Sequence, residues 1–273
     1  MEKLIRTIND NVNMDNTFMG EDGLLYCAIC GEPRQAIVDM PTIGEMTVNL
    51  ICGCMKQAMA ENDTREREET ADRLRAVCFG NKAMKDCTFE NSECEEEYKD
   101  IMQSYVNNFA KFKSKGKGLI LCGKVGTGKT FLASCVANAL IDKGVKVLMT
   151  NLREIESGVW ENKQQYIDSL NSYSLLVIDD LGVERNTEYM QELMYGVVNS
   201  RYAAGLPMII TTNLTIEELK RPKDIGSSRI YERILERCYP IEVKGTNKRR
   251  MIIRNEYDET RELLGIKKGE QNG

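Results

Sequence analysis

The sequence predicts an α/β protein in which helices cover both faces of a parallel sheet, preceded by a small cysteine-containing module. Short apolar segments alternate with helical segments from about residue 89 onward, and continuous apolar strands are typical of a parallel sheet buried on both faces. One such segment leads into a glycine-rich sequence that ends in Lys129-Thr130. Four of the ten cysteines form two close pairs within the first 58 residues.

The order of these features along the chain indicates four regions. Residues 1–58 hold the paired cysteines, and residues 41–51 alternate β-branched and polar side chains around a glycine, as in a hairpin. Residues 59–88 are predicted to form a helical linker, because the first part of this stretch is rich in Glu, Arg and Ala with charges at helical spacing. Residues 89–256 are expected to form the main domain and residues 257–273 a C-terminal tail.

Within the main domain, each short apolar segment is predicted to be a buried strand. A helix is predicted from Thr130 to Asp142, ending at Gly144, a residue suited to the turn after a helix. The predicted strands are residues 118–122, 145–149, 175–178 and 208–212.

The glycine-rich sequence after the first strand fits the G-x-x-x-x-G-K-[ST] pattern of a phosphate-binding loop in full. Its position between a strand and an amphipathic helix disfavours an ordinary glycine-rich turn. The glycines allow backbone N–H groups to surround phosphates, and the helix N-terminus adds its positive dipole end. Lys129 is expected to reach the β- and γ-phosphates of ATP, and the Thr130 hydroxyl to coordinate Mg²⁺. The predicted nucleotide-binding residues are Gly123, Lys124, Val125, Gly126, Thr127, Gly128, Lys129 and Thr130.

Two later strands end in polar residues suited to ATP hydrolysis. Asp179 is expected to hold Mg²⁺, and Asp180 to orient and deprotonate the attacking water. Asn213 follows the strand at 208–212 and could hold that water or contact the γ-phosphate. An Asp-Asp pair can also cap a helix, and Asn is common where strands become turns, so this interpretation depends on the order of the motifs.

The paired cysteines Cys27, Cys30, Cys52 and Cys54 are predicted to form a closed structural zinc site. Each pair can chelate one metal ion from a tight turn, and four thiolates complete a tetrahedral zinc site with no open position. The alternatives are unligated cysteines and a redox pair, although no thioredoxin-like βαβ pattern surrounds these residues. Arg34 is the only basic residue between the pairs, so the module is expected to contact protein rather than nucleic acid.

The composition restricts the remaining possibilities. The chain has no histidine, so zinc must be bound by cysteine or carboxylate and no imidazole can act as a base. No segment has the apolar length of a membrane span or of a secretory signal, which predicts a cytoplasmic protein without a membrane partner. The net charge of −5 argues against a uniformly basic nucleic-acid coat, although residues 217–254 are locally basic and are a candidate DNA surface.

From about Phe89 to Arg254 the sequence resembles the AAA+ ATPases of the bacterial helicase-loader family of the DnaC/DnaI type, which also includes phage-encoded loaders. The phosphate-binding loop alone identifies only the larger superfamily. The more specific matches are Leu175–Gly182, Ile209–Leu214 and Ser228–Ile234. The resemblance implies an AAA+ domain whose helical lid is short or missing.

The resemblance also implies roles for individual residues. Arg233 is similar in placement to an arginine finger offered to the γ-phosphate of a neighbouring subunit. Arg249, or Arg250 beside it, occupies the place of an arginine that senses the nucleotide. A surface salt bridge or a DNA-facing charge is the alternative for each arginine. Asp180 departs from the Glu of many AAA+ enzymes, which implies slower hydrolysis.

The function predicted from these observations is ATP-dependent loading of a replicative DNA helicase, with ATP, Mg²⁺ and Zn²⁺ as cofactors. The zinc module would bind the hexameric helicase. The AAA+ domains would self-assemble, and nucleotide would control their hold on single-stranded DNA and on the helicase. Two alternatives are a transposition helper ATPase of the IstB type and a non-enzymatic adaptor in which ATP only fixes a conformation.

Overall fold

The computed structural model describes most of the 273 residues. The described residues are 15–41, 44–80, 83–159, 162–182, 187–222 and 224–247, with residues 257, 260, 261, 263 and 264. Arg249, Arg250 and most residues after Arg254, where the lid is expected to be short or missing and a tail is predicted, therefore lie outside the described residues.

The chain divides into two compact units, residues 1–69 and 70–273. This division places one boundary inside the stretch that the sequence predicts to be a linker, residues 59–88. The four-region boundaries stay a prediction.

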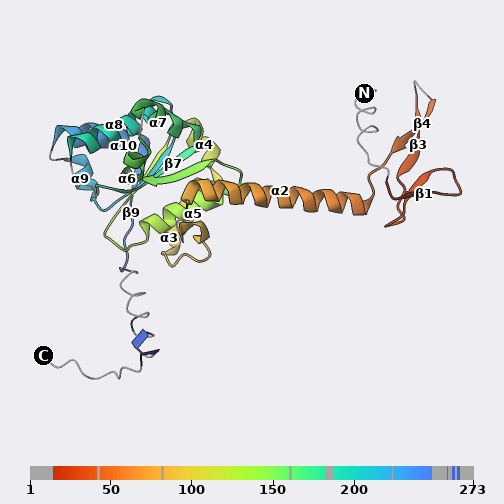
Figure 1. The fold of residues 1–273 in the computed structure, drawn as a ribbon, viewed down its shortest axis with the longest axis horizontal. Coiled ribbons are helices and arrows are strands. Elements are labelled where there is room, and N and C mark those ends of the chain that lie inside the picture. Colours follow the sequence, from red (N-terminus) through yellow and green to blue (C-terminus); the bar gives the residue numbers. More distant parts are fainter. Residues whose placement is uncertain are drawn as a thin grey trace. The chain divides into compact units, whose positions relative to one another are not determined.

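The N-terminal unit contains two short antiparallel hairpins. Strand β1 (Thr17–Met19) pairs with β2 (Leu25–Cys27), and β3 (Gln35–Met40) pairs with β4 (Gly44–Asn49) (Figure 1). The hairpin predicted within residues 41–51 was therefore placed too late, because that range holds only the second strand. The first strand carries consecutive apolar residues, and it lacks the alternation by which a strand is recognised.

A long helix, α2 (Gly53–Phe79), follows these hairpins; it begins before the predicted helical linker of residues 59–88 and ends before the last residue of that linker. Its first turn contains Cys54, and its charged middle part is exposed, as its Glu- and Arg-rich sequence predicts. The buried residues of α2 are Ala71, Cys78 and Phe79, all near its C-terminal end, where they join the core of the second unit.

The second unit is built on a five-stranded sheet. Its strands are β6 (Val147–Asn151), β7 (Leu175–Leu181), β8 (Met208–Thr212), β5 (Gly118–Cys122) and β9 (Cys238–Glu242), in that spatial order and all parallel. The predicted parallel sheet is confirmed. The strand β9 has no counterpart among the predicted ranges, because Pro240 interrupts its apolar pattern; Pro is tolerated at a sheet edge, where β9 lies.

Alternating residues of each strand are buried on opposite faces, as Leu119 and Ile120 illustrate. One face is covered by the end of α2, η1 (Ala83–Asp86), α3 (Glu96–Asn107), α4 (Phe109–Ser114) and α5 (Lys129–Ile141). The other is covered by α6 (Leu152–Gly158), α7 (Lys163–Ser169), η2 (Leu170–Ser172), α8 (Glu188–Ala203), α9 (Ile216–Lys220) and α10 (Ile225–Arg237). Figure 1 shows α3 and α5 on one side of the sheet and α7, α8 and α10 on the other. Among the described helices, none combines the length and apolar character that a bilayer crossing requires.

Candidate nucleotide site and cysteine cluster

The glycine-rich loop connects the carboxyl end of β5 to the first residue of α5. Gly126 and Gly128 have φ values of 84° and 95°, in the left-handed region that favours glycine. A Cβ at Gly126 would lie 2.1 Å from Oδ1 of Asn247, and one at Gly128 would lie 2.6 Å from the Cys94 sulfur. Both positions therefore require glycine, and the loop leads directly into the N-terminus of α5, where the helix dipole and the first backbone N–H groups favour an anion.

The side chain of Lys129 is held at the centre of this loop. Its Nζ donates hydrogen bonds to the carbonyl oxygens of Gly123 and Lys124, at 2.8 and 2.9 Å, and to Oδ1 of Asn213 at 2.9 Å. Lys129 is buried, so solvent screens its ammonium charge only weakly. The structure thus brings the predicted loop lysine and the predicted strand-end amide into direct contact.

The carboxylate of Asp179 lies beside the start of α5. Its Oδ1 accepts hydrogen bonds from the hydroxyls of Thr130 and Thr211, at 2.9 and 2.6 Å. Parallel strands end at the same edge of a sheet, so Asp179 on β7 and Thr211 on β8 reach the loop that follows β5. Thr211 was not predicted as a site residue; the signal was the pair of hydroxyls, Thr211 and Thr212, that ends an otherwise apolar, fully buried strand.

The backbone at Asp180 departs from regular strand geometry. Its φ is 57°, an uncommon value for a non-glycine residue, and the pairing of β7 with β8 shifts register between Ile178 and Leu181. The backbone N–H of Asp180 donates to the Thr211 hydroxyl at 2.9 Å. The regular pairing of β7 with β8 is therefore interrupted at the second aspartate.

The predicted arginines have different outcomes. Arg233 lies on α10, with its guanidinium 4.9 Å from the ring centre of Tyr195 and 5.4 Å from that of Tyr202, both on α8. It does not take part in the hydrogen bonds that join Lys129, Asp179 and Asn213. Arg249 and Arg250 lie outside the described residues.

The four predicted zinc ligands gather in the N-terminal unit. The sulfurs of Cys27, Cys30, Cys52 and Cys54 all lie within 4.8 Å of one another. Cys54 is 3.5 Å from Cys27 and 3.3 Å from Cys52. A tetrahedral site with Zn–S bonds of about 2.3 Å needs sulfurs about 3.8 Å apart, so the cluster could hold a zinc ion after small adjustments.

Hydrogen bonds shift the pKa values of two of these thiols in opposite directions. Backbone N–H groups of Cys30 and Ile29 point at the Cys27 sulfur and lower its pKa to about 6, which favours the thiolate that a metal requires. The hydrogen bonds with Cys52 and Cys27 raise the pKa of Cys54 to about 12, so this thiol needs a bound cation to deprotonate. The Glu32 carboxylate joins the two pairs, because it accepts a 2.5 Å hydrogen bond from the backbone N–H of Gly53.

Comparison with known proteins gives matches to ATP-binding proteins and helicase loaders. The family model described as IstB-like ATP binding protein matches residues 52–255. The replicative helicase loader DnaI of Bacillus subtilis (strain 168) is 28% identical over 180 residues, which are 59% of this chain and 58% of that protein. The replicative helicase loader DnaC of Escherichia coli (strain K12) is 28% identical over 182 residues, which are 57% of this chain and 73% of that protein.

A solved structure supports the same fold. A crystal structure of DnaI aligns with a TM-score of 0.52 at 23% identity and covers 64% of this chain and 98% of that chain. At this identity the similarity shows the fold alone, and it confirms the predicted α/β architecture. The chain spans less than two thirds of the full length of the DnaI relative.

Proposed function

The chain belongs to the family of IstB-like ATP-binding proteins of the AAA+ class, and from that premise we propose that it is an ATPase that loads a replicative DNA helicase onto single-stranded DNA. Two relatives carry the name replicative helicase loader. The observation that carries the proposal is the contact of Lys129 with Asn213 and of Thr130 with Asp179 around one phosphate-binding loop.

In this proposal the loop binds the phosphates of ATP. The N–H groups at the start of α5 and the Lys129 ammonium neutralise the β- and γ-phosphates. The Thr130 hydroxyl and the Asp179 carboxylate are oxygen ligands of the kind that Mg²⁺ prefers, and their oxygens are already 2.9 Å apart. Bound Mg²⁺ would supply further neutralisation of phosphate charge.

Asp180 and Asn213 are the proposed partners of the attacking water. Asp180 is the candidate base, and its unusual backbone at the bulge supports a functional placement, because strained residues cluster at active sites. Asn213 would hold the water or the γ-phosphate once Lys129 has phosphate oxygens to bind. Arg233 would act on the site of a neighbouring subunit, and Arg249 would sense the nucleotide.

The cysteine module is the proposed contact with the helicase. Arg34, its one basic residue between the cysteine pairs, is buried and donates a hydrogen bond from Nε to the carbonyl of Leu50. A phosphate-binding surface therefore has little support here. Exposed apolar residues offer a protein-binding surface instead: Phe18, Met19, Ile29, Ile37 and Val38.

Co-purification with the hexameric replicative helicase of the same cell tests this function. We expect the zinc-loaded chain to retain the helicase, and Ile29→Asp to weaken retention at least tenfold, because it puts a charge on the proposed apolar surface. Ile225→Asp is a matched control, since Ile29 and Ile225 are 73% and 76% exposed and Ile225 lies in the other unit. Equal retention of all three proteins would contradict the proposed docking.

The family description also fits a transposition helper. That alternative predicts ATP binding without helicase retention, and it would be favoured if neither the parent chain nor the variants retained the helicase.

A further inference from the structure

The amino-terminal edge of the sheet, opposite the nucleotide site, is strongly basic. It is formed by the connections that lead into the five strands, residues 109–117, 142–146, 170–174, 201–207 and 236–237. These connections contain eight Lys or Arg residues and two acidic residues. The chain as a whole carries a net charge of −5, so this edge is a local reversal of charge.

Six lysines of this edge are exposed: Lys111, Lys113, Lys115, Lys117, Lys143 and Lys146. Three of them form hydrogen bonds to neighbouring elements. Lys113 Nζ donates to the Ser174 hydroxyl before β7, and Lys117 Nζ donates to the carbonyl of Glu236 before β9. Lys143 Nζ donates to Oδ1 of Asn107 at the end of α3.

The positive charge of this edge is not neutralised within the described part of the chain. None of the six lysines forms an ion pair with a described carboxylate. The two acidic residues of the edge are already engaged, since Asp142 pairs with Arg75 and the Glu236 carboxylate accepts the Tyr202 hydroxyl at 2.7 Å. A surface of this kind attracts polyanions.

An apolar groove of about 800 Å³ lies next to these lysines. Its charged lining residues are Lys117, Arg237, Asp100 and Glu236, and its apolar lining includes Ile101, Tyr105, Phe112 and Tyr239. Tyr239, on the edge strand β9, is 72% exposed, an unusual position for a large aromatic side chain. Basic side chains beside an exposed aromatic ring are the combination that binds single strands, through phosphates and through stacked bases.

We propose that the six lysines and the Tyr239 groove bind single-stranded nucleic acid at the amino-terminal edge of the sheet. The lysines contact phosphates, and a base stacks on the Tyr239 ring. This inference depends on the part of the proposed function that names single-stranded DNA as a partner, but it requires neither ATP nor a helicase. It places the contact at the opposite edge of the sheet from Lys220, Arg221 and Lys244, which follow the carboxyl ends of β8 and β9.

Fluorescence anisotropy with a labelled oligothymidylate tests the lysines. The full chain, zinc-loaded and without nucleotide or helicase, is compared with the triple variant Lys111→Gln, Lys113→Gln, Lys115→Gln, which keeps Lys117 and its hydrogen bond to Glu236. We expect affinity to fall at least tenfold. The slope of log K against log salt should decrease by about 2, because each lost phosphate contact on a single strand contributes about 0.7. Thermal unfolding of both proteins verifies that the variant is folded.

A matched triple variant beyond the carboxyl ends of β8 and β9, Lys220→Gln, Arg221→Gln, Lys244→Gln, is expected to bind within about twofold of the parent chain. Tyr239→Ala should lose about fivefold or more, whereas Tyr239→Phe keeps the stacking ring and should bind like the parent. The proposal is overturned if the triple variant at Lys220, Arg221 and Lys244 loses affinity and the edge variant does not. It is also overturned if the edge variant still binds the oligonucleotide but no longer sediments with phosphatidylserine vesicles, since the edge would then bind membrane.

Discussion

The two units of this chain are stabilised in different ways. Among the described residues of the N-terminal unit only Cys27, Arg34 and Cys52 are buried, whereas the second unit buries alternating strand residues on both faces of a five-stranded sheet. A short segment cannot bury enough apolar surface to fold alone, so metal binding has to supply the difference. The comparison leads us to expect that the first unit depends on zinc and the second on its apolar core.

Removal of zinc should separate the units most clearly. We expect chelation, or Cys52→Ser, to unfold β1 to β4, because structural zinc contributes about 10–16 kcal/mol to small zinc-binding peptides. The second unit should keep its thermal midpoint within about 2 °C. Differential scanning calorimetry, with zinc content measured on the same samples, checks both expectations. If both units unfold in one thermal transition, and that transition is lost when zinc is removed, the two units are not stabilised separately.

A substitution in the sheet should destabilise the second unit and leave the zinc-binding first unit unchanged. Ile210 is fully buried in β8, and Ile210→Ala should cost about 2–5 kcal/mol of unfolding free energy through lost burial and a cavity. Urea unfolding followed by circular dichroism measures this cost, and bound zinc should be unchanged. Ile225→Ala, at an exposed position, is the control and should cost less than about 0.5 kcal/mol. Loss of bound zinc in Ile210→Ala would contradict the claim that the two units are stabilised independently.

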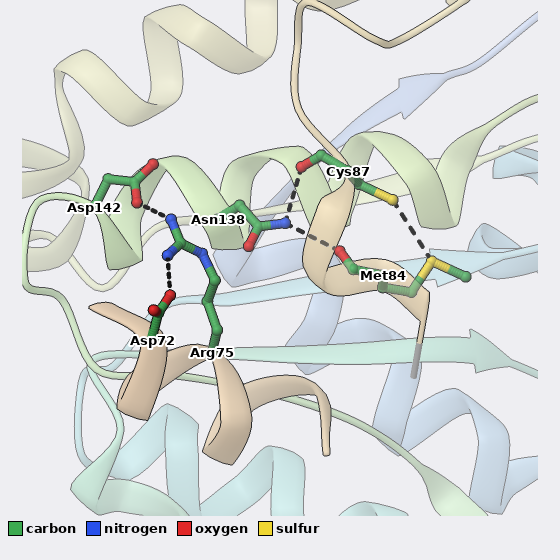
Figure 2. Close-up of polar contacts among 6 residues, drawn as sticks. All are labelled: Asp72, Arg75, Met84, Cys87, Asn138 and Asp142. Carbon is green, nitrogen blue, oxygen red and sulfur yellow. Dashed lines mark hydrogen bonds and ion pairs between the residues drawn. The ribbon is translucent and has the colours of Figure 1, made fainter. Parts of the chain in front are cut away.

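The connection between α5 and the segment after α2 gives a smaller effect. Figure 2 shows the Asn138 amide on α5 between two carbonyls, and its Nδ2 donates to Met84 O at 3.0 Å and to Cys87 O at 2.8 Å. Asn138→Ala leaves these acceptors without their donor and should destabilise the second unit by about 1–3 kcal/mol. Asn107→Ala, at an exposed site on α3, is the control. Equal urea midpoints for the two variants would mean that this segment is not part of the second unit.

The smallest effect is expected where α2 reaches α5. Arg75 of α2 pairs with Asp72 and with Asp142 at the end of α5 (Figure 2). The three side chains are partly exposed, so Arg75→Ala should cost no more than about 1 kcal/mol. Arg65→Ala, earlier on α2, should have no measurable effect on the second unit. A loss of several kcal/mol for Arg75→Ala would show that α2 contributes far more to this unit than the comparison implies.

The residues that the sequence located best are those whose place follows from strand order. Lys129, Asp179 and Asn213 each follow or end an apolar segment, and parallel strands bring such ends to one edge of the sheet. The cysteine pairs could be matched from spacing alone, because each short turn fixes two sulfurs.

Other contacts had no local signal in the sequence. Cys94 and Asn247 lie against the glycines of the loop only because distant segments fold back to it. Arg201 is fully buried, with its guanidinium donating to the carbonyls of Tyr173 and Pro207, although its sequence context is that of an exposed helix end. The strand register that places Thr211 beside Asp179 is likewise a property of the assembled sheet.

Isothermal titration of the zinc-loaded chain with ATP, in the presence and absence of Mg²⁺, tests the central claim most directly. We expect saturable, magnesium-dependent binding. We expect Lys129→Ala to lose about a hundredfold or more in affinity for ATP and still to show a cooperative thermal unfolding transition, which verifies that it is folded. Lys220→Ala, at an exposed position away from the loop, should bind like the parent chain. No affinity for ATP in the folded parent chain, or equal affinity in Lys129→Ala, would contradict a nucleotide site at residues 123–130.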